Sequence, residues 1–249
     1  MNESVSNEQQ LLADNDVLDR VSRMKAEFFG AMNHNIKTPL TIISSCLHSM
    51  SDMITFGDID EDEMKEMLGI AQREVMRLSE MLRENIRNMS SFDTHQGMEA
   101  IDTAQFLTET AGLYHTMLER RFNTLKTEIP QNLPAIHGNK DMLAQVMANL
   151  ISNANRYTSG GVITIAAEGC GEFVKIIVRD SGTGIKPELL PNLFERGVSD
   201  GGTGLGLYIC KMIVEEMHKG VLSAESSDAG TTFSIELPVS GAGGGQVDE

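Results

Sequence analysis

The sequence has no tryptophan, few cysteines and prolines, and a shortage of basic residues. Lys and Arg total 20 against 36 Asp and Glu, and the formal net charge of -16 argues against nucleic acid and anionic membrane surfaces as partners. Cys46, Cys170 and Cys210 have neither metal-site nor disulfide-framework spacing, which suits a reducing, cytoplasmic compartment. No apolar run reaches the length of about 18 residues that a membrane segment needs. We therefore expect a soluble chain, or the soluble part of a membrane-linked or multi-subunit system.

The first part of the chain has the pattern of two amphipathic helices. Apolar residues recur three and four positions apart over residues 11–53 and again over 64–89. Between them, Gly57 and the acidic residues 58–63 predict a turn and a negatively charged helix start. The two stripes predict a helical hairpin, which has little core of its own. We expect two copies to pair as a four-helix bundle, and packing against the rest of the same chain is the alternative.

One histidine in the first predicted helix is a candidate nucleophile. The spacing places His34 on the side of the helix opposite the apolar stripe, where a solvent-facing imidazole can react at neutral pH. Asn35 follows it directly, and Thr38 lies one turn further along on the same face. Pro39 removes a helix hydrogen bond there and should bend the helix. Taken alone, an exposed histidine on a helix is usually an ordinary surface residue.

The second part of the chain alternates helices and strands. The patterns predict helices over residues 103–120, 140–157 and 205–217, and strands over 123–129, 162–168, 173–179, 221–226 and 232–237. This order predicts an α/β sandwich with one helical layer on a mixed sheet. We therefore divide the chain into a helical domain (1–92), a linker (93–102), an α/β domain (103–239) and a disordered glycine-rich tail (240–249).

Two segments of the second part suit the binding of a nucleotide and its metal ion. Asn149 and Asn153 lie one helical turn apart, and their amide oxygens suit Mg²⁺, although such pairs also arise from capping or packing. Asp180 ends a predicted strand, where a carboxylate can accept a hydrogen bond from an exocyclic amine. Gly182 and Gly184 after it let the backbone approach a flat ring, and a plain glycine turn is the alternative.

Two further segments of the second part also suit nucleotide binding. The glycine cluster at residues 201–206 opens the helix predicted at Leu205, and its bare amides form an anion cradle. This cluster is not a Walker motif, because no Gly-Lys-Ser/Thr follows. In Gly-Thr-Thr-Phe at residues 230–233, Thr231 places a hydroxyl at the start of the last strand.

The order of these motifs resembles a known family. The asparagine pair, Asp-x-Gly-x-Gly, a segment containing Phe194, Gly-x-Gly-x-Gly and Gly-Thr-x-Phe resemble the ATP-binding domain shared by gyrase-type ATPases and sensor histidine kinases. The stretch His-Asn-Ile-Lys-Thr-Pro-Leu at 34–40 resembles the phosphoacceptor box of the histidine kinases specifically. The resemblance implies a helical hairpin, dimerised as a four-helix bundle, followed by an α/β sandwich of the GHKL (Bergerat) ATPase fold.

The resemblance also implies a two-component histidine protein kinase that uses ATP and Mg²⁺. Asp180 would accept a hydrogen bond from the adenine amino group, and Asn153, helped by Asn149, would hold Mg²⁺. The other implied nucleotide contacts are Arg156, Tyr157, Gly182, Gly184, Ile185, Phe194, Arg196, Gly202, Gly204, Leu205, Gly206 and Thr231. For Arg196, a plain surface arginine is the alternative. The phosphoryl group would pass to Nε2 of His34 and then to an aspartate of a response-regulator receiver domain. Thr38 matches the position that orients a water for dephosphorylating that partner.

The sequence departs from the family pattern at two places. Asn35 stands where the family usually carries Glu or Asp, and its amide can neither take a proton nor supply a negative charge. We therefore predict slow autophosphorylation, with a nucleotide-binding switch or phosphatase that lacks autokinase activity as the alternative. The short lid at residues 195–201 predicts modest ATP affinity. A serine kinase or ATPase of the same superfamily is a further alternative, but it would not need a hairpin that displays a histidine.

Overall fold

A computed structural model of the chain describes residues 2–57, 59–90, 97–198 and 204–240. Within these ranges, the side chains of residues 2–21, 24, 25, 27, 28, 31, 34 and 83–90 are outside the description. The chain divides into a helical unit within Met1–Phe92 and an α/β unit within Asp93–Ser199 and Gly204–Glu249. The predicted tail at 241–249 lies outside the described residues.

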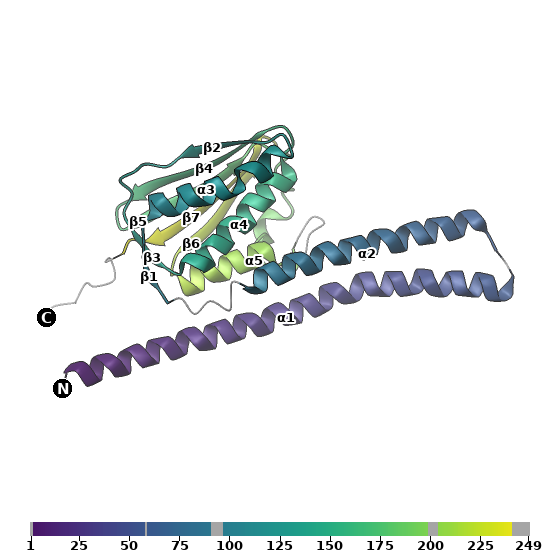
Figure 1. Cartoon of the computed structure of the whole chain (residues 1–249), viewed down its shortest axis with the longest axis horizontal. Coiled ribbons are helices and arrows are strands. Elements are labelled where there is room, and N and C mark those ends of the chain that lie inside the picture. The colour runs from purple at the N-terminus through teal and green to yellow at the C-terminus, as the bar shows by residue number, and fades with distance from the viewer. Residues whose placement is uncertain (1, 58, 91–96, 199–203, 241–249) are drawn as a thin grey trace. The chain divides into compact units, whose positions relative to one another are not determined.

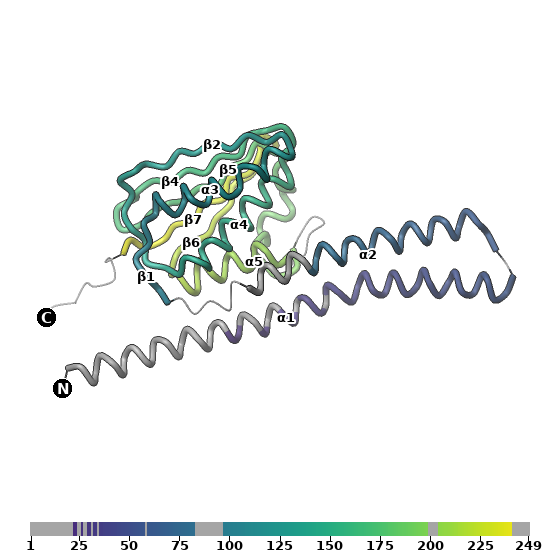
Figure 2. Tube along the Cα trace, viewed as in Figure 1, coloured from purple at the N-terminus to yellow at the C-terminus, as the bar shows by residue number. Residues whose placement is uncertain are grey.

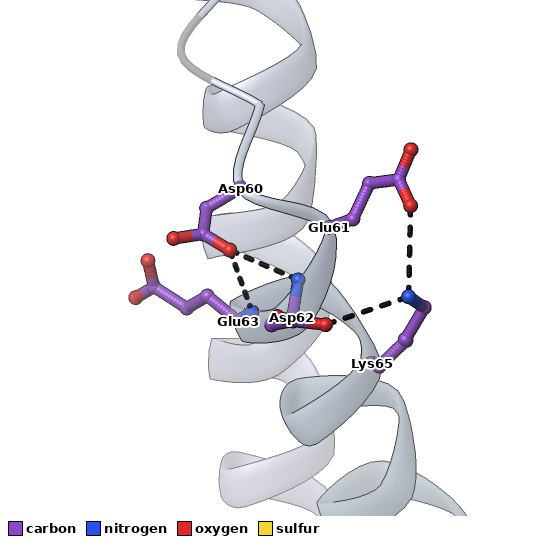
Figure 3. A network of polar contacts seen from close by, with 5 residues as sticks. All are labelled: Asp60, Glu61, Asp62, Glu63 and Lys65. Carbon is purple, nitrogen blue, oxygen red and sulfur yellow. Dashed lines mark hydrogen bonds and ion pairs between the residues drawn. The ribbon is translucent and has the colours of Figure 1, made fainter.

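The helical unit is a hairpin of two long helices, α1 (Asn2–Phe56) and α2 (Glu61–Ser90), which confirms the predicted hairpin (Figure 1). The predicted acidic start of the second helix is also present. Asp60 Oδ1 accepts hydrogen bonds from the backbone N–H groups of Asp62 and Glu63 at 2.9 and 3.1 Å (Figure 3). These carboxylates suit the positive end of the helix dipole.

Each helix of the hairpin carries apolar side chains that the other helix does not cover. On α1, Leu40, Leu47 and Ile54 recur every seven residues and are 46%, 56% and 60% exposed. On α2, Leu68, Val75 and Leu82 repeat the same spacing and are 49%, 49% and 39% exposed. A seven-residue repeat of apolar side chains is the pattern by which helices pack against further helices. The hairpin therefore has a second apolar face available for a partner.

The α/β unit is built on a five-stranded mixed sheet in the order β2-β4-β5-β7-β6 (Figure 2). Its strands are β2 (Thr124–Glu128), β4 (Val162–Cys170), β5 (Phe173–Asp180), β6 (Val221–Ser227) and β7 (Gly230–Pro238). Only β2 and β4 pair in parallel, and the other neighbours are antiparallel. The predicted strands and the mixed sheet are confirmed.

One face of this sheet is covered by the helices α3 (Thr103–Glu119), α4 (Lys140–Tyr157) and α5 (Gly206–Lys211) (Figure 1). On β5, the alternate residues Val174, Ile176 and Val178 are at most 2% exposed, as expected for the helix-covered face. Of the helices in the described part of the chain, none has an apolar stretch long enough to cross a bilayer.

The structure differs from the sequence prediction at four short elements. Residues Glu99–Ile101, inside the predicted linker, form strand β1, which pairs with the unpredicted strand β3 (Ile136–Gly138). A short 3₁₀ turn covers Leu190–Asn192. The helix predicted over 205–217 is α-helical only to Lys211 and continues as a π-helix over Met212–Met217. Three-residue strands are too short to show alternation, and π-helical geometry has no distinct apolar period.

A buried histidine joins the π-helix to the start of α4. His218, which is 3% exposed, caps the π-helix, and its Nδ1 donates to the backbone oxygen of Ile213 at 2.7 Å. Its Nε2 accepts a hydrogen bond from the backbone N–H of Asn139, the N-cap of α4, at 3.0 Å. Both bonds are satisfied together only by the neutral ring with a proton on Nδ1. Burial, with a smaller contribution from His137, lowers the pKa of His218.

This arrangement predicts an acid-sensitive contribution to stability. The unfolded chain takes up a proton on His218 more readily than the folded chain, so its contribution is complete above the ordinary histidine pKa of about 6.5 and is lost as the pH falls below that value. We expect the melting temperature to fall less between about pH 8 and about pH 5.5 in His218→Gln than in the unsubstituted protein. His137→Gln, which removes an exposed histidine nearby, should retain most of the fall, because burial is the larger cause of the lowered pKa of His218. An equal fall of the melting temperature in His218→Gln and in the unsubstituted protein would contradict the assignment of this acid sensitivity to His218.

Candidate functional site

The candidate site of the α/β unit is organised around the carboxylate at the end of β5. Asp180 is 6% exposed, and its Oδ1 accepts hydrogen bonds from the backbone N–H groups of Gly182 at 2.9 Å and Thr231 at 3.3 Å. The hydroxyl of Thr158, just after α4, donates to the same oxygen at 3.5 Å. These donors come from the β5 end, the β7 start and the α4 end, so the carboxylate joins three elements.

The second oxygen of this carboxylate remains available to a ligand. No described residue donates a hydrogen bond to Oδ2 of Asp180. Burial raises the pKa of the carboxyl group, and the hydrogen bonds from Gly182, Thr231 and Thr158 oppose this shift. A buried carboxylate with one unused acceptor oxygen suits a ligand that presents an N–H donor, such as the exocyclic amino group of adenine.

The loop after Asp180 is held close to its neighbours and needs its glycines. A Cβ on Gly182 would lie 2.4 Å from the backbone oxygen of Tyr157. Gly184 has φ +72°, and a Cβ there would lie 2.0 Å from the backbone oxygen of Ser227. The backbone N–H of Ile185 donates to Oγ of Ser226 at 2.8 Å, which fastens the end of the loop to β6.

The structure brings together five of the predicted residues: Asp180, Gly182, Gly184, Ile185 and Thr231. Thr231 is 4% exposed, and its hydroxyl lies 3.0 Å from Oγ of Ser226. Sequence reasoning missed Thr158 and Ser226, which complete this polar cluster. Thr158 directly follows the predicted Arg156 and Tyr157, so its position was a usable signal, whereas a serine within a strand offers none.

The two predicted asparagines of α4 have different surroundings. The Asn153 side chain is half-buried and has no hydrogen-bond partner among the described residues, so its amide oxygen is open to a cation. Asn149 is engaged within the protein: its Nδ2 donates to the backbone oxygen of Gly206 at 3.2 Å, and its Oδ1 accepts from Gln145 at 3.3 Å. Arg156 is exposed in the last turn of α4, and Tyr157 beside it is half-buried.

The remaining predicted residues lie around the start of α5. Leu205, fully buried, is the N-cap of α5, and the carbonyl of Gly204 accepts from the N–H of Gly197 at 3.0 Å. Phe194 packs edge-on against Phe233 with ring centroids 6.4 Å apart. Phe194 and the exposed Arg196 line a groove of about 450 Å³, together with Glu195, Tyr208, Lys211, Met212, Glu215 and Glu216. Neither Asn153 nor Asp180 lines this groove. Gly202 and part of the predicted lid lie outside the described residues.

The second candidate site is on α1. His34 lies within this helix, but its side chain is outside the described residues, so its predicted exposure stays a prediction. Asn35 is half-buried and Thr38 is exposed. The helix continues through Pro39, which has no N–H to donate to the carbonyl of Asn35. An open groove of about 510 Å³ runs along α1 on both sides of this point, lined by Asn33, Ile36, Lys37, Leu40, Thr41, Ser44, Ser45 and His48.

Comparison with known proteins identifies two family models that match this chain. Residues 24–94 match the family model described as "His Kinase A (phospho-acceptor) domain". Residues 138–241 match the one described as "Histidine kinase-, DNA gyrase B-, and HSP90-like ATPase". The chain belongs to the sensor histidine kinases, with a phosphoacceptor domain and an ATPase domain of the GHKL fold.

Individual relatives support this assignment. The chain is 32% identical over 235 residues to the sensor protein SrrB of Staphylococcus aureus (strain NCTC 8325 / PS 47), which covers 88% of this chain and 39% of SrrB. The chain thus spans well under half the length of that relative. The catalytic domain of histidine kinase ThkA is 26% identical, with a TM-score of 0.54, over 58% of this chain and 97% of that domain. Acinetobacter baumannii histidine kinase AdeS shares the fold at 21% identity, with a TM-score of 0.54, over 83% of this chain and 98% of AdeS.

The crowding of the loop after Asp180 gives a direct prediction. Gly184→Ala should lower the free energy of unfolding of the α/β unit by more than about 2 kcal/mol, because the left-handed backbone alone costs an L-residue about 1–2 kcal/mol and the added Cβ would also meet Ser227. Gly160→Ala is the matched control, since Gly160 has φ +66° with nothing within 4 Å of its Cβ position. Denaturant unfolding that gave equal losses for the two variants would refute the close contact.

Proposed function

We propose that this chain is a histidine autokinase that binds Mg-ATP in the α/β unit and transfers its γ-phosphoryl group to His34. The observation that carries the proposal is the pair of open acceptors: Oδ2 of the buried Asp180 and the amide oxygen of Asn153. The first suits the amino group of adenine and the second suits Mg²⁺. Their presence in a chain that also carries a phosphoacceptor domain supports a kinase.

Other residues have supporting roles in this proposal. Thr231 and the loop glycines Gly182 and Gly184 lie around Asp180 and shape the base site. Arg156 and Tyr157 steady the phosphates from the end of α4, and Gly202, Gly204 and Gly206 cradle them with backbone N–H groups. The walls of the proposed nucleotide site are supported by Ile185, Phe194 and Leu205. Arg196 is a further proposed phosphate contact, and an ordinary surface arginine stays the alternative, since Arg196 lines a groove whose lining excludes Asn153 and Asp180.

In the proposed transfer, Nε2 of His34 attacks the γ-phosphorus, the bond to the bridging oxygen breaks, and ADP leaves. Phosphoryl transfer depends mainly on the positioning of the reacting groups and on the neutralisation of the phosphate charge. Bound Mg²⁺ would supply this neutralisation. The phosphoryl group then passes to an aspartate of a response regulator in the cytoplasm. A solved complex joins histidine kinase ThkA to the response regulator TrrA, and this chain shares its fold at 23% identity with a TM-score of 0.61, over 88% of this chain and 64% of ThkA. We place the receiver domain on the groove along α1, which begins at Asn33 beside His34.

Asn35 sets the rate in this proposal. A carboxylate at this position would accept the Nδ1 proton of His34 and make Nε2 more nucleophilic, and general-base help of this kind is worth about 10²- to 10⁴-fold. Asn35 offers only a neutral amide, so we propose slow autophosphorylation. The alternative is a chain without autokinase activity that binds nucleotide and acts as a switch or phosphatase. The exposed Thr38 favours retention of a phosphatase activity, because its hydroxyl can orient a water.

Labelled ATP with Mg²⁺ tests the transfer directly. We expect slow label incorporation that is lost in His34→Ala, because that change removes the acceptor nitrogen. Asn35→Glu should raise the initial rate by about tenfold or more through restored general-base help. Equal rates for Asn35→Glu and the unsubstituted protein would remove the argument from Asn35.

The stability of the labelled product separates the alternatives. Phosphohistidine is lost in acid, whereas phosphoserine survives, so acid-labile label supports the proposal. Acid-stable label would indicate a serine kinase of the same superfamily. Nucleotide binding without any label would indicate the switch or phosphatase.

We also propose that two hairpins pair as a homodimer through the exposed seven-residue repeats on α1 and α2. Leu47→Glu should convert the dimer to a monomer in light scattering, because it places a charge in the row formed by Leu40, Leu47 and Ile54. Leu113→Glu is the matched control, since Leu113 is 80% exposed on α3 and lies outside the repeats. A dimer that survives Leu47→Glu would place the interface elsewhere.

A further inference from the structure

Asn149 is held at both ends of its side chain by the protein. Its Oδ1 accepts a hydrogen bond from Nε2 of Gln145 at 3.3 Å, and its Nδ2 donates to the backbone oxygen of Gly206 at 3.2 Å. Gln145 lies one turn earlier on α4 and is 7% exposed, and Asn149 itself is half-buried. Asn153, one turn later, has no partner among the described residues. The side chains of Asn149 and Asn153 therefore have different surroundings.

The acceptor of this bond lies where the glycine cluster becomes a packed helix. Gly206 is the first residue of α5, directly after the fully buried Leu205. No side chain caps the start of α5. One turn further, the buried Cys210 places its thiol 3.8 Å from the backbone oxygen of Val146 on α4. Polar contacts with α4 thus occur at Gly206 and, one turn later, at Cys210.

We infer that Asn149 is a positioning residue that fixes the start of α5 to α4, rather than a ligand of the metal ion. The inference rests on the proposed nucleotide site for its functional consequence, but both atoms of the hydrogen bond that it describes belong to the protein. Because α4 also carries Asn153, the contact sets the distance between the proposed metal ligand and the start of α5 at Leu205 and Gly206. Loss of the contact would let the start of α5 move relative to Asn153.

Asn149→Asp separates positioning from metal binding, because the two roles predict opposite results. A carboxylate is a ligand that Mg²⁺ favours, so a metal ligand changed to Asp should keep or strengthen Mg²⁺-dependent binding. A carboxylate cannot donate to the Gly206 oxygen and would repel it, so the positioning role predicts a loss. Gln145→Met is the matched second variant: it removes the donor to Asn149, keeps a similar volume and leaves both asparagines in place.

The first measurement is amide hydrogen exchange in the full chain without nucleotide. We expect Asn149→Asp to speed exchange of the α5 amides, such as the Ile209 N–H bonded to Leu205, by about tenfold. Gln145→Met should act in the same direction with a smaller factor. Exchange in strands β4 and β5 should not change, and this also verifies that the variants fold. Unchanged exchange in α5 for both variants would overturn the inference.

The second measurement is calorimetric titration with adenine nucleotide, with Mg²⁺ and with EDTA. Asn149→Asp should weaken binding by about tenfold in both conditions, and KM for ATP should rise by a larger factor than kcat falls. Weakening confined to the Mg²⁺ condition, or tighter binding with Mg²⁺, would identify Asn149 as a metal ligand and overturn the inference. If the unsubstituted chain bound no nucleotide, the proposed function would fail, while hydrogen exchange would still decide whether Asn149 holds α5.

Discussion

The buried carboxylate of Asp180 is the interaction on which the rest of the α/β unit's site depends. Burying a carboxylate is costly, and the cost is offset here by donors from the loop after β5, the start of β7 and the end of α4. Because all of them meet on one oxygen, Asp180 fixes these elements relative to one another. Its other oxygen stays available, so the group that stabilises the junction is also the group that can recognise a ligand.

A second constraint separates two kinds of helix in this chain. Helices α3, α4 and α5 bury their apolar faces against the sheet, whereas α1 and α2 leave rows such as Leu40, Leu47 and Ile54 exposed. The α/β unit therefore completes its core within one chain, and the hairpin does not. This difference supports the proposed roles of the two units. The α/β unit, which has its own core, would bind nucleotide, and the hairpin, which needs a partner, would carry the phosphoacceptor His34.

The sequence alone predicted the hairpin, the five strands of the main sheet and the helices α3 and α4, because each carries a clear apolar period or strong turn signals. It missed β1, β3 and the π-helical continuation of α5, whose geometry depends on contacts distant in sequence. The motifs singled out Asp180, its loop and Thr231, and the structure brings these residues together. The resemblance made Asn149 a helper of Asn153 in holding Mg²⁺, and only the structure shows that the partner of Asn149 is the backbone of Gly206, 57 positions away in sequence. A backbone acceptor of this kind has no signature in the sequence.

The most direct test of the account is a calorimetric comparison of ATP and GTP binding to the unsubstituted chain and to Asp180→Asn. Adenine presents an amino group where guanine presents a carbonyl, and a carboxylate accepts a hydrogen bond from the first and repels the second. We predict a preference for ATP of at least about tenfold in the unsubstituted chain and loss of that preference in Asp180→Asn. Equal affinity for the two nucleotides, or an unchanged preference in the variant, would contradict the central role of Asp180.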